Sequence, residues 1–377
     1  MTTKWILIAG AYPPSPGGVS DYTWLVANEL AQHGEVHVWT GPSPGPEAQS
    51  PVIVHRLPDF SPLSIRRMHV EMMQVQGPKQ IVIEYVAQAF GYRGFNVFFA
   101  LWLAALRPMR PWVMFHEVEV SRIPGQPVKE RIQAIVTSWM ACRIVRAADK
   151  SFVSTSNWIG KLQRHAPNAT IIHAPIPSNI PTRADTARVT DIRTQYSGKG
   201  LRLLGHFGTY RMREVNHYLE RVLPSLLRAG NDRRLLLLGQ HGDTFGAQLR
   251  QSHPDLAELI HPIGALPPSE LAAHLSACDV LLQPYPEGAT TRRGSLQAAL
   301  ALGSAVVTTL GPESELLWAE SDAVALATPD TQSFIDTAEH LIGDEQFCSS
   351  LRKSATEMYA RTFSLDMTID ALLRELT

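Results

Sequence analysis

The sequence is poor in the features that mark several large classes of protein. Its 377 residues include only three cysteines, Cys142, Cys278 and Cys348, which lie far apart and show neither a metal-type spacing nor a disulfide framework. This cysteine usage is typical of a reducing cytosol. Lysine and arginine (34) nearly balance aspartate and glutamate (35), so the net charge of −1 does not favour nucleic acid as a partner.

Long apolar runs are also missing. The longest, Val97–Leu106, falls well short of the roughly 20 residues that a membrane span needs, so we expect a buried helix there. Met1–Gly10 lacks the flanks of a signal peptide, and we expect a cytoplasmic protein. Arg66–Arg67 and Arg107–Arg110 leave open two interpretations, peripheral contact with anionic lipid at the inner face of a membrane and simple solvation.

What is present is typical of a globular protein. Hydrophobic residues make up 45% of the chain and charged residues 18%, which excludes a disordered chain, and the length exceeds one ordinary core. Short apolar runs alternate with helical patterns twice over, and we expect strands at 4–9, 36–40, 53–57, 80–85, 112–116, 150–154, 170–173, 201–207, 234–238, 261–264, 279–285, 305–309 and 323–327. This alternation predicts an α/β protein with two Rossmann-like, doubly wound parallel sheets facing across a cleft.

Prolines and polar residues predict the boundary between these domains. Pro175, Pro177 and Pro181 precede a polar stretch, so we expect a first domain over 1–182 and a linker over 183–200. The second domain then covers 201–363.

The most informative stretch lies between residues 283 and 312. It reads as a strand, a polar loop, a helix over 295–302 and another strand, with Ser295 expected to cap the helix and Gly303 to end it. A loop in this position lies at the carboxyl edge of a parallel sheet, where open α/β sheets bind ligands.

The residues of this loop suit a sugar phosphate. Arg292 and Arg293 stand beside a helix N-terminus, where guanidinium groups and free N–H groups together favour an anion. Glu287, followed by Gly288, suits sugar hydroxyls. The alternative is a surface loop whose arginines are merely solvated.

Two features of the first half are candidates for the same chemistry. Gly17 and Gly18 follow the first strand in a loop rich in proline and glycine, and they allow either a tight turn or the close approach of a ligand. The dinucleotide pattern G-x-G-x-x-G is absent there. His116 ends a strand, where it is placed either for chemistry or for a bond to the backbone.

Two stretches together resemble a known family. Residues 12–23 read YPPSPGGVSDYT, and residues 284–309 begin PYPEG and end LQAALALGSAVVTT. They resemble the opening and the donor-binding segment of the retaining GT-B glycosyltransferases of family four, the glycosyl transferases of group 1. The resemblance covers nearly the whole chain and implies a GT-B fold with a terminal helix, 364–377, that packs back on the first domain.

The donor-binding segment departs from that family's pattern. Most members carry two glutamates eight positions apart, but here the second position is Ser295 or, counted back from Gly303, Ala298. Gln297 stands nearby. The arginine and lysine that typically hold the donor diphosphate are not in their usual places, and Arg211, Arg213, Arg292 or Arg293 could substitute.

The resemblance implies the transfer of a sugar, with retention, from a nucleotide-sugar donor to a saccharide or lipid-linked acceptor in surface polysaccharide or glycolipid synthesis. His116 and Glu287 would be the catalytic residues. The first domain would build the acceptor pocket, and Tyr85–Asn96 and His116–Pro127 are its segments that the sequence constrains least. The set expected to bind the donor and its phosphates is Gly17, Gly18, Arg211, Arg213, Gly288, Arg292, Arg293, Ser295 and Gln297. We expect no cofactor and no metal site, because no D-x-D pair occurs.

Three alternatives remain at this point. One is a non-catalytic binding protein with the GT-B fold, because the second glutamate is missing. Another is a nucleotide-sugar 2-epimerase, which would need no acceptor. A phosphorylase is disfavoured, because no lysine stands in a context typical of a pyridoxal cofactor.

Overall fold

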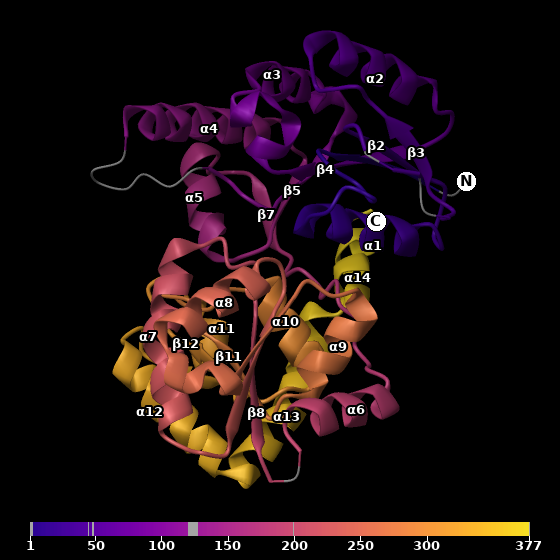
Figure 1. The fold of residues 1–377 in the computed structure, drawn as a ribbon. Helices are drawn as coiled ribbons and strands as arrows, with labels where there is room; N and C mark the ends of the chain where they lie inside the picture. Colours follow the sequence, from indigo (N-terminus) through magenta and orange to yellow (C-terminus); the bar gives the residue numbers. More distant parts are fainter. Residues whose placement is uncertain (1–2, 44, 47–48, 120–126, 199, 377) are drawn as a thin grey trace. The chain divides into compact units, whose positions relative to one another are not determined.

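The structure is a computed structural model, and it describes residues 3–43, 45–46, 49–119, 127–198 and 200–376. The chain divides into two compact units (Figure 1). The first unit comprises residues 1–176 and 368–377, and the second comprises residues 177–367. The chain therefore passes from one unit to the other twice.

A seven-stranded parallel sheet forms the centre of the first unit. Its strand order is β3-β2-β1-β4-β5-β6-β7. The strands are β1 (Lys4–Ala9), β2 (Val36–Thr40), β3 (Ile53–Arg56), β4 (Lys79–Tyr85), β5 (Trp112–Phe115), β6 (Lys150–Val153) and β7 (Thr170–His173). The order reverses between β1 and β4, which makes that point of the sheet edge a switch point suited to ligands.

Helices cover both faces of this sheet. They are α1 (Gly18–Leu30), α2 (Pro62–Gln74), α3 (Val97–Ala105), α4 (Val128–Ala147), α5 (Asn157–His165) and α14 (Leu365–Arg374). Helices α2, α3 and α4 pack over Ile6, Ile8 and Ile83, whereas α1 lies on the opposite face (Figure 1). From Thr368 onward α14 belongs to this unit, and Lys150 donates a 2.6 Å hydrogen bond to the carbonyl of Glu375 just beyond that helix.

The second unit has the same design with six parallel strands. Its order is β10-β9-β8-β11-β12-β13, which reverses between β8 and β11. The strands are β8 (Arg202–Phe207), β9 (Arg233–Leu238), β10 (Ile260–Gly264), β11 (Val280–Gln283), β12 (Val306–Thr309) and β13 (Ala325–Ala327). The helices are α6 (Thr186–Tyr196), α7 (Arg213–Arg228), α8 (Gly242–Ser252), α9 (Pro268–Ala277), α10 (Gly294–Ala301), α11 (Leu316–Ala319), α12 (Thr331–Gly343) and α13 (Glu345–Met358). Two parallel doubly wound sheets are thus confirmed.

The expected linker is the main correction to the predicted organisation. Most of the range 183–200 forms α6, which belongs to the second unit. Asp185 caps α6 by accepting hydrogen bonds from the backbone N–H groups of Ala187 and Arg188. Ile192 on α6 is fully buried. Polar composition suggested a linker, but one buried stripe and a capping carboxylate are enough for a docked helix.

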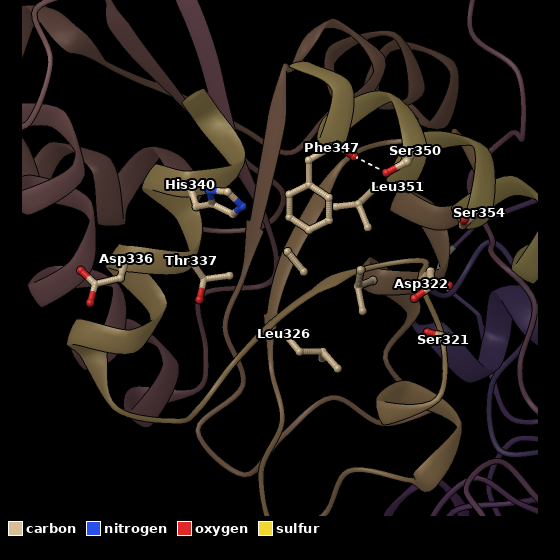
Figure 2. Close-up of a pocket in the computed structure, with 12 residues that line it drawn as sticks. Ser321, Asp322, Leu326, Asp336, Thr337, His340, Phe347, Ser350, Leu351 and Ser354 are labelled. Carbon is tan, nitrogen blue, oxygen red and sulfur yellow. Dashed lines mark hydrogen bonds between the residues drawn. The ribbon is translucent and has the colours of Figure 1, made fainter. Parts of the chain in front are cut away.

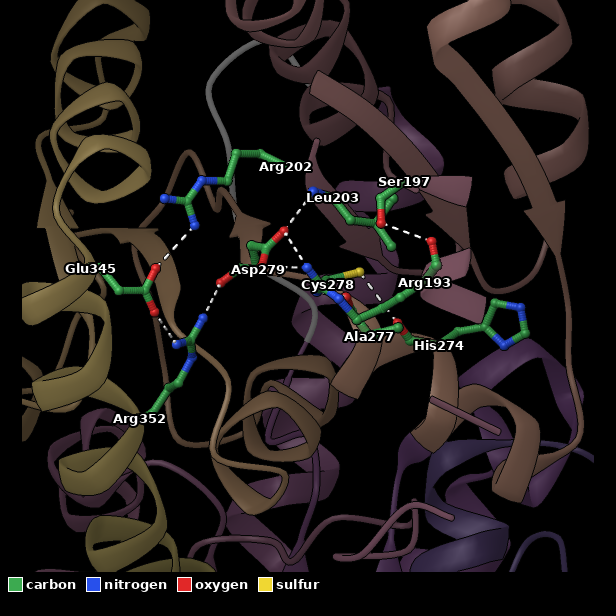
Figure 3. Close-up of polar contacts among 10 residues, drawn as sticks. All are labelled: Arg193, Ser197, Arg202, Leu203, His274, Ala277, Cys278, Asp279, Glu345 and Arg352. Carbon is green, nitrogen blue, oxygen red and sulfur yellow. Dashed lines mark hydrogen bonds and ion pairs between the residues drawn. The ribbon is translucent and has the colours of Figure 1, made fainter. Parts of the chain in front are cut away.

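A polar network at the start of β11 explains why α6 is held in place (Figure 3). Arg193 of α6 forms an ion pair with Asp279 at 3.1 Å and donates a 2.6 Å hydrogen bond to the carbonyl of Ala277. Asp279 also accepts a 2.7 Å hydrogen bond from the Leu203 N–H, and Arg352 of α13 donates to the Asp279 carbonyl at 3.1 Å. This one carboxylate therefore joins α6 to the start of two central strands.

Candidate functional site

The predicted donor residues of the second unit lie at its switch point. The loop after β11 runs from Pro284 to Arg293, and the loop after β8 runs from Gly208 to Met212. The two loops touch, because Nη1 of Arg293 lies 3.6 Å from the Met212 sulfur. The structure therefore brings together two loops that are far apart in sequence.

Gly288 shapes the first half of the β11 loop. Its φ of +105° suits glycine, and a Cβ added there would lie 2.3 Å from the Ser314 hydroxyl and 2.6 Å from the Gly311 nitrogen. The neighbouring backbone is tied to the loop after β12, since the Ala289 N–H donates to the Thr309 carbonyl at 2.8 Å. The position needs glycine because two loops meet there.

Arg293 is largely buried and already has partners. Its guanidinium forms an ion pair with Glu287 and stacks over the Tyr285 ring at 4.7 Å. Burial lowers the pKa of Arg293 relative to a free arginine. The structure thus places the two residues expected to bind phosphate and sugar in direct contact with each other.

Arg292 is more exposed than Arg293. Its side chain is 32% exposed and lies 4.0 Å from the Glu313 carboxylate, in the loop after β12. Helix α10 begins at Gly294, so both arginines stand directly before its N-terminus. Unpaired N–H groups of a helix's first turn and two guanidinium groups together favour an anion.

Two predictions about α10 are corrected. Ser295 is the second residue of the helix and does not cap it, because Arg293 holds the cap position and no side chain caps this helix. The Ser295 hydroxyl lies 2.8 Å from the Tyr285 hydroxyl instead. Gln297 is fully buried, and its amide donates a 3.0 Å hydrogen bond to the Thr291 carbonyl. Gln297 therefore shapes the loop from behind and has no exposed surface for a ligand.

Arg211 and Arg213 lie at the end of the β8 loop, and both are exposed. The Arg211 Nε is 3.4 Å from the His241 ring, at the start of α8, and Arg213 is the first residue of α7. Arg211 is therefore on the loop that contacts Arg293, and Arg213 directly follows that loop.

A buried histidine supports the β8 loop. His206 lies near the end of β8, and its Nδ1 is 2.9 Å from the Tyr210 hydroxyl. Complete burial lowers the pKa of His206 to about 3, so the ring is neutral at physiological pH. No pattern in the sequence had indicated a role for His206.

In the first unit, Gly17 and Gly18 lie at the N-terminus of α1, beside the switch point. Gly17 has φ +153° and ψ 148°, a backbone conformation available essentially to glycine alone. Both residues are exposed, and a Cβ at either would meet no atom within 4 Å. The space above this helix end is open, as the close approach of a ligand would need.

His116 follows β5 and is buried beside a carboxylate. Its Nε2 donates a 2.8 Å hydrogen bond to Glu84 of β4, and its ring meets Tyr22 of α1 edge-on at 4.7 Å. Burial, and then the Glu84 charge, raise the pKa of Tyr22 well above its usual range. Glu84 was not singled out from the sequence; its place near the end of a strand at the switch point is the signal that could have found it.

The predicted acceptor pocket can be described only in part, because residues 120–126 lie outside the described structure. Its other segment follows β4 and contains consecutive residues with positive φ, namely Gly91 (+83°), Tyr92 (+51°) and Arg93 (+54°). Such backbone strain at the carboxyl edge of a sheet is typical of functional loops.

A separate hollow of about 680 Å³ lies beside β13, between α12 and α13 (Figure 2). Side chains that line it include His340, Phe347 and Leu326. None of the predicted catalytic and donor-binding residues, all of which the structure describes, lines this hollow.

In the part of the chain that the structure describes, no helix combines the length and the apolar composition that crossing a bilayer requires.

Comparison with known proteins adds a family match for part of the chain and a fold for the whole of it. Residues 201–344 match the family model described as "Glycosyl transferases group 1". No curated protein matches the sequence. Among solved structures, HepE of Anabaena, in complex with UDP and glucose, is 14% identical over 100% of this chain and 99% of that one, with a TM-score of 0.70.

Two other structures are similar over their full length. Sucrose-phosphate synthase from Thermosynechococcus elongatus is 17% identical, with 99% of each chain covered and a TM-score of 0.72. WaaG, a glycosyltransferase involved in lipopolysaccharide biosynthesis, is 14% identical, with 99% of each chain covered and a TM-score of 0.70. The chain as a whole therefore has the GT-B fold, and residues 201–344 of its second unit are similar to the glycosyl transferases of group 1.

Proposed function

We propose that this protein transfers a sugar, with retention, from a nucleotide-sugar donor to a saccharide or glycolipid acceptor. The observation that carries the proposal is the position of Arg292 and Arg293, directly before α10 and at the switch point of the second sheet. The family match over residues 201–344 supports it, and HepE, which has the same fold, was crystallised with UDP-glucose.

The arginines suit the central demand of this chemistry. When the bond between sugar and nucleotide breaks, negative charge develops on the departing phosphate, and donors held in place beforehand stabilise it most effectively. Arg292 and the N-terminus of α10 are positioned to supply such donors, with Arg211 or Arg213 as additional cations. In the first unit, Gly17 and Gly18 would let the backbone approach a phosphate closely.

The carboxylate and the histidine would contact the sugars. Glu287 would accept hydrogen bonds from hydroxyls of the donor sugar, which requires that the ligand share or replace the ion pair with Arg293. His116 has its Nε2 committed to Glu84, so Nδ1 is the ring atom through which it would bond a sugar hydroxyl.

The experiment that tests the proposal is a thermal-shift panel of UDP, GDP, ADP and CDP with their common sugar conjugates. A ligand that binds only the folded state raises the melting temperature by mass action. We expect one nucleotide to raise it, and the corresponding sugar conjugate to be consumed when an acceptor is supplied. The shift and the turnover should persist in EDTA, because we propose that no metal takes part. If no nucleotide raises the melting temperature, the transferase proposal is wrong.

The same panel separates the alternatives. Inversion at C2 of UDP-N-acetylglucosamine without acceptor would identify a 2-epimerase. Nucleotide binding without any consumption of donor would favour a non-catalytic binding protein. Anomeric analysis of the product by NMR tests retention.

The outer helices of the first unit support a peripheral contact with an anionic membrane. Exposed large apolar side chains are concentrated on α2, α3 and α4, namely Leu63, Val70, Met73, Phe98, Leu101, Val128, Ile132, Ile135 and Trp139. On α4, the last four recur at helical spacing and form one outward stripe. An exposed apolar stripe of this kind favours contact with another surface that removes it from water.

Charges around this stripe favour lipid of negative charge. Lys129, Arg131, Arg143 and Arg146 are exposed on α4 against one exposed carboxylate, Glu130. Arg143 stacks over Trp139 at 5.3 Å, an arrangement suited to a membrane interface. Of the arginines predicted from the sequence, Arg67 and Arg110 are already paired with Glu71 and Asp149, which reduces their part.

Vesicle sedimentation tests this contact. We expect binding to vesicles that contain phosphatidylglycerol, but not to pure phosphatidylcholine, and the binding should weaken with salt. Ile135→Gln with Trp139→Gln should abolish it, whereas Leu316→Gln, at an exposed leucine of the second unit, should not. Equal sedimentation of all three proteins, or dimerisation through α4, would refute the proposal.

A further inference from the structure

A buried carboxylate lies directly behind the arginine pair. Glu315, in the loop between β12 and α11, is 4% exposed. It accepts hydrogen bonds from the Thr291 backbone N–H at 2.9 Å, from the Thr291 hydroxyl at 2.5 Å and from the Trp318 indole N–H at 3.0 Å. Two of these three bonds fix a single residue of the β11 loop.

Thr291 is held from the other side as well. Its carbonyl accepts a 3.0 Å hydrogen bond from the Gln297 amide of α10. The backbone donor, the backbone acceptor and the hydroxyl of Thr291 are thus all engaged, and the residue is completely buried. The next two residues are Arg292 and Arg293, and the turn closes when the Arg293 N–H donates to the Thr290 carbonyl at 3.1 Å.

We propose that Glu315 is a positioning residue, which acts through Thr291 to hold Arg292 and Arg293 where they would bind the leaving diphosphate. The inference rests on the proposed function. Stability alone is a poor reason for burying a carboxylate, because well-packed apolar residues usually serve a fold equally well. A clamp on the residue before two cations gives the carboxylate a purpose, since preorganised donors are the ones that stabilise a developing charge.

A double-mutant cycle tests the proposal. Affinities for UDP, GDP, ADP and CDP are measured by calorimetry for the wild type, Glu315→Gln, the double variant Arg292→Ala with Arg293→Ala, and the triple variant. Glu315→Gln should lower the affinity for whichever nucleotide the wild type binds by about 10-fold or more. The reason is that the new side-chain amide places N–H groups opposite the N–H and O–H donors of Thr291. The triple variant should bind no more weakly than the double variant, because Glu315 acts only through the arginines.

Two further variants separate positioning from folding. Trp318→Phe removes the third partner of the carboxylate without touching Thr291, and it should leave nucleotide affinity unchanged even where it lowers the melting temperature. Thr291→Val removes one of the two bonds and should weaken affinity in the same direction, by less than Glu315→Gln. Amide exchange at Thr291 in the ligand-free protein should be faster in Glu315→Gln than in the wild type.

The outcomes separate this inference from the function on which it rests. If the wild type binds none of the four nucleotides, the proposed function fails and the inference falls with it. If the wild type binds one of them but Glu315→Gln binds it equally well, only the inference is wrong. The same holds if the effects of the glutamate and the arginine substitutions multiply in the triple variant.

Discussion

The two sheets reverse their strand order in the same way, yet their switch points are furnished differently. In the first unit, the candidate ligand contacts are exposed backbone at Gly17 and Gly18 and a histidine buried against Glu84. In the second, they are guanidinium groups that already face carboxylates, with Arg293 against Glu287 and Arg292 near Glu313. One topology therefore provides an open helix end in one unit and a set of charged side chains in the other.

The comparison shows that the same position at a sheet edge can present either backbone N–H groups or charged side chains to a ligand. Backbone N–H groups at an open helix end need only space, which glycine provides. Arginine side chains need support, because an unpaired buried charge is costly. In the second unit Arg293 is paired with Glu287 and Arg292 lies near Glu313, and these contacts are where the comparison can be tested.

The largest effect should come from removing the cations of the second unit. Arg292→Ala with Arg293→Ala should weaken binding of a nucleoside diphosphate by about 3 kcal/mol or more, since each charge-assisted hydrogen bond is worth about 1.5–3 kcal/mol. Calorimetry measures the change, and Arg221→Ala, which removes one exposed arginine of α7, is the control for a general effect of lost positive charge. Unchanged affinity in the double variant would show that the second unit does not recognise the diphosphate through these arginine side chains.

Glycine substitutions should differ sharply between the units. Gly288→Ala should destabilise the protein by about 2–4 kcal/mol, because the residue has positive φ and its new Cβ would collide with the backbone of Gly311. Gly18→Ala should change stability by no more than about 0.5 kcal/mol, because the space around it is open and it lies inside α1. Urea denaturation measures both.

Gly18→Ala also probes function independently of stability. If the N-terminus of α1 approaches the donor phosphate, a methyl group there should weaken nucleotide affinity in a protein with wild-type stability. Wild-type affinity in this variant would remove Gly18 from the proposed phosphate-binding residues.

The buried pair of the first unit should show a smaller effect on stability. His116→Ala leaves the Glu84 carboxylate without its histidine partner and should cost about 1–3 kcal/mol. Because the two residues share one interaction, adding Glu84→Ala to His116→Ala should cost less than the two single changes predict together. Strict additivity in urea denaturation would show that the two side chains stabilise the fold independently.

The last prediction concerns the pH dependence of stability that a buried histidine of the second unit causes. His206 has a pKa of about 3 in the folded state, so between pH 6.5 and 3 the unfolded chain binds a proton that the folded chain does not. This group therefore makes the protein less stable as pH falls through that window, by up to about 1.4 kcal/mol per pH unit. The free energy of unfolding of His206→Gln should fall less steeply than that of the wild type. Parallel slopes would contradict the prediction.

The strands were predictable because central strands of a parallel sheet are buried on both faces and read as continuous apolar runs. The run at β1 is one example, and all its residues from Trp5 to Ala9 are buried. Helix α6 was not predicted, because the polar residues around it indicated a linker. Asp185, which caps the helix, and the apolar Ile192 were the signals that could have indicated it. No helix was expected at α2 either, although Ser61 and Pro62 are typical of a helix start.

The site was predictable only where chemistry follows directly from position along the chain. Arg292, Arg293 and Glu287 could be named as candidates because they occupy one loop after one strand. Glu84 and Glu315 could not, because their partners lie 32 and 24 residues away in sequence. Such contacts depend on the packing of separate strands, which no local pattern encodes.

The double passage of the chain between the units has a consequence for synthesis. All residues of the second unit, 177–367, lie between two segments of the first. The second unit can therefore finish folding as one continuous stretch, whereas the first unit waits for residues 368–377, which are translated after it. A ribosome stalled before that last helix would display a complete second unit joined to an unfinished first one.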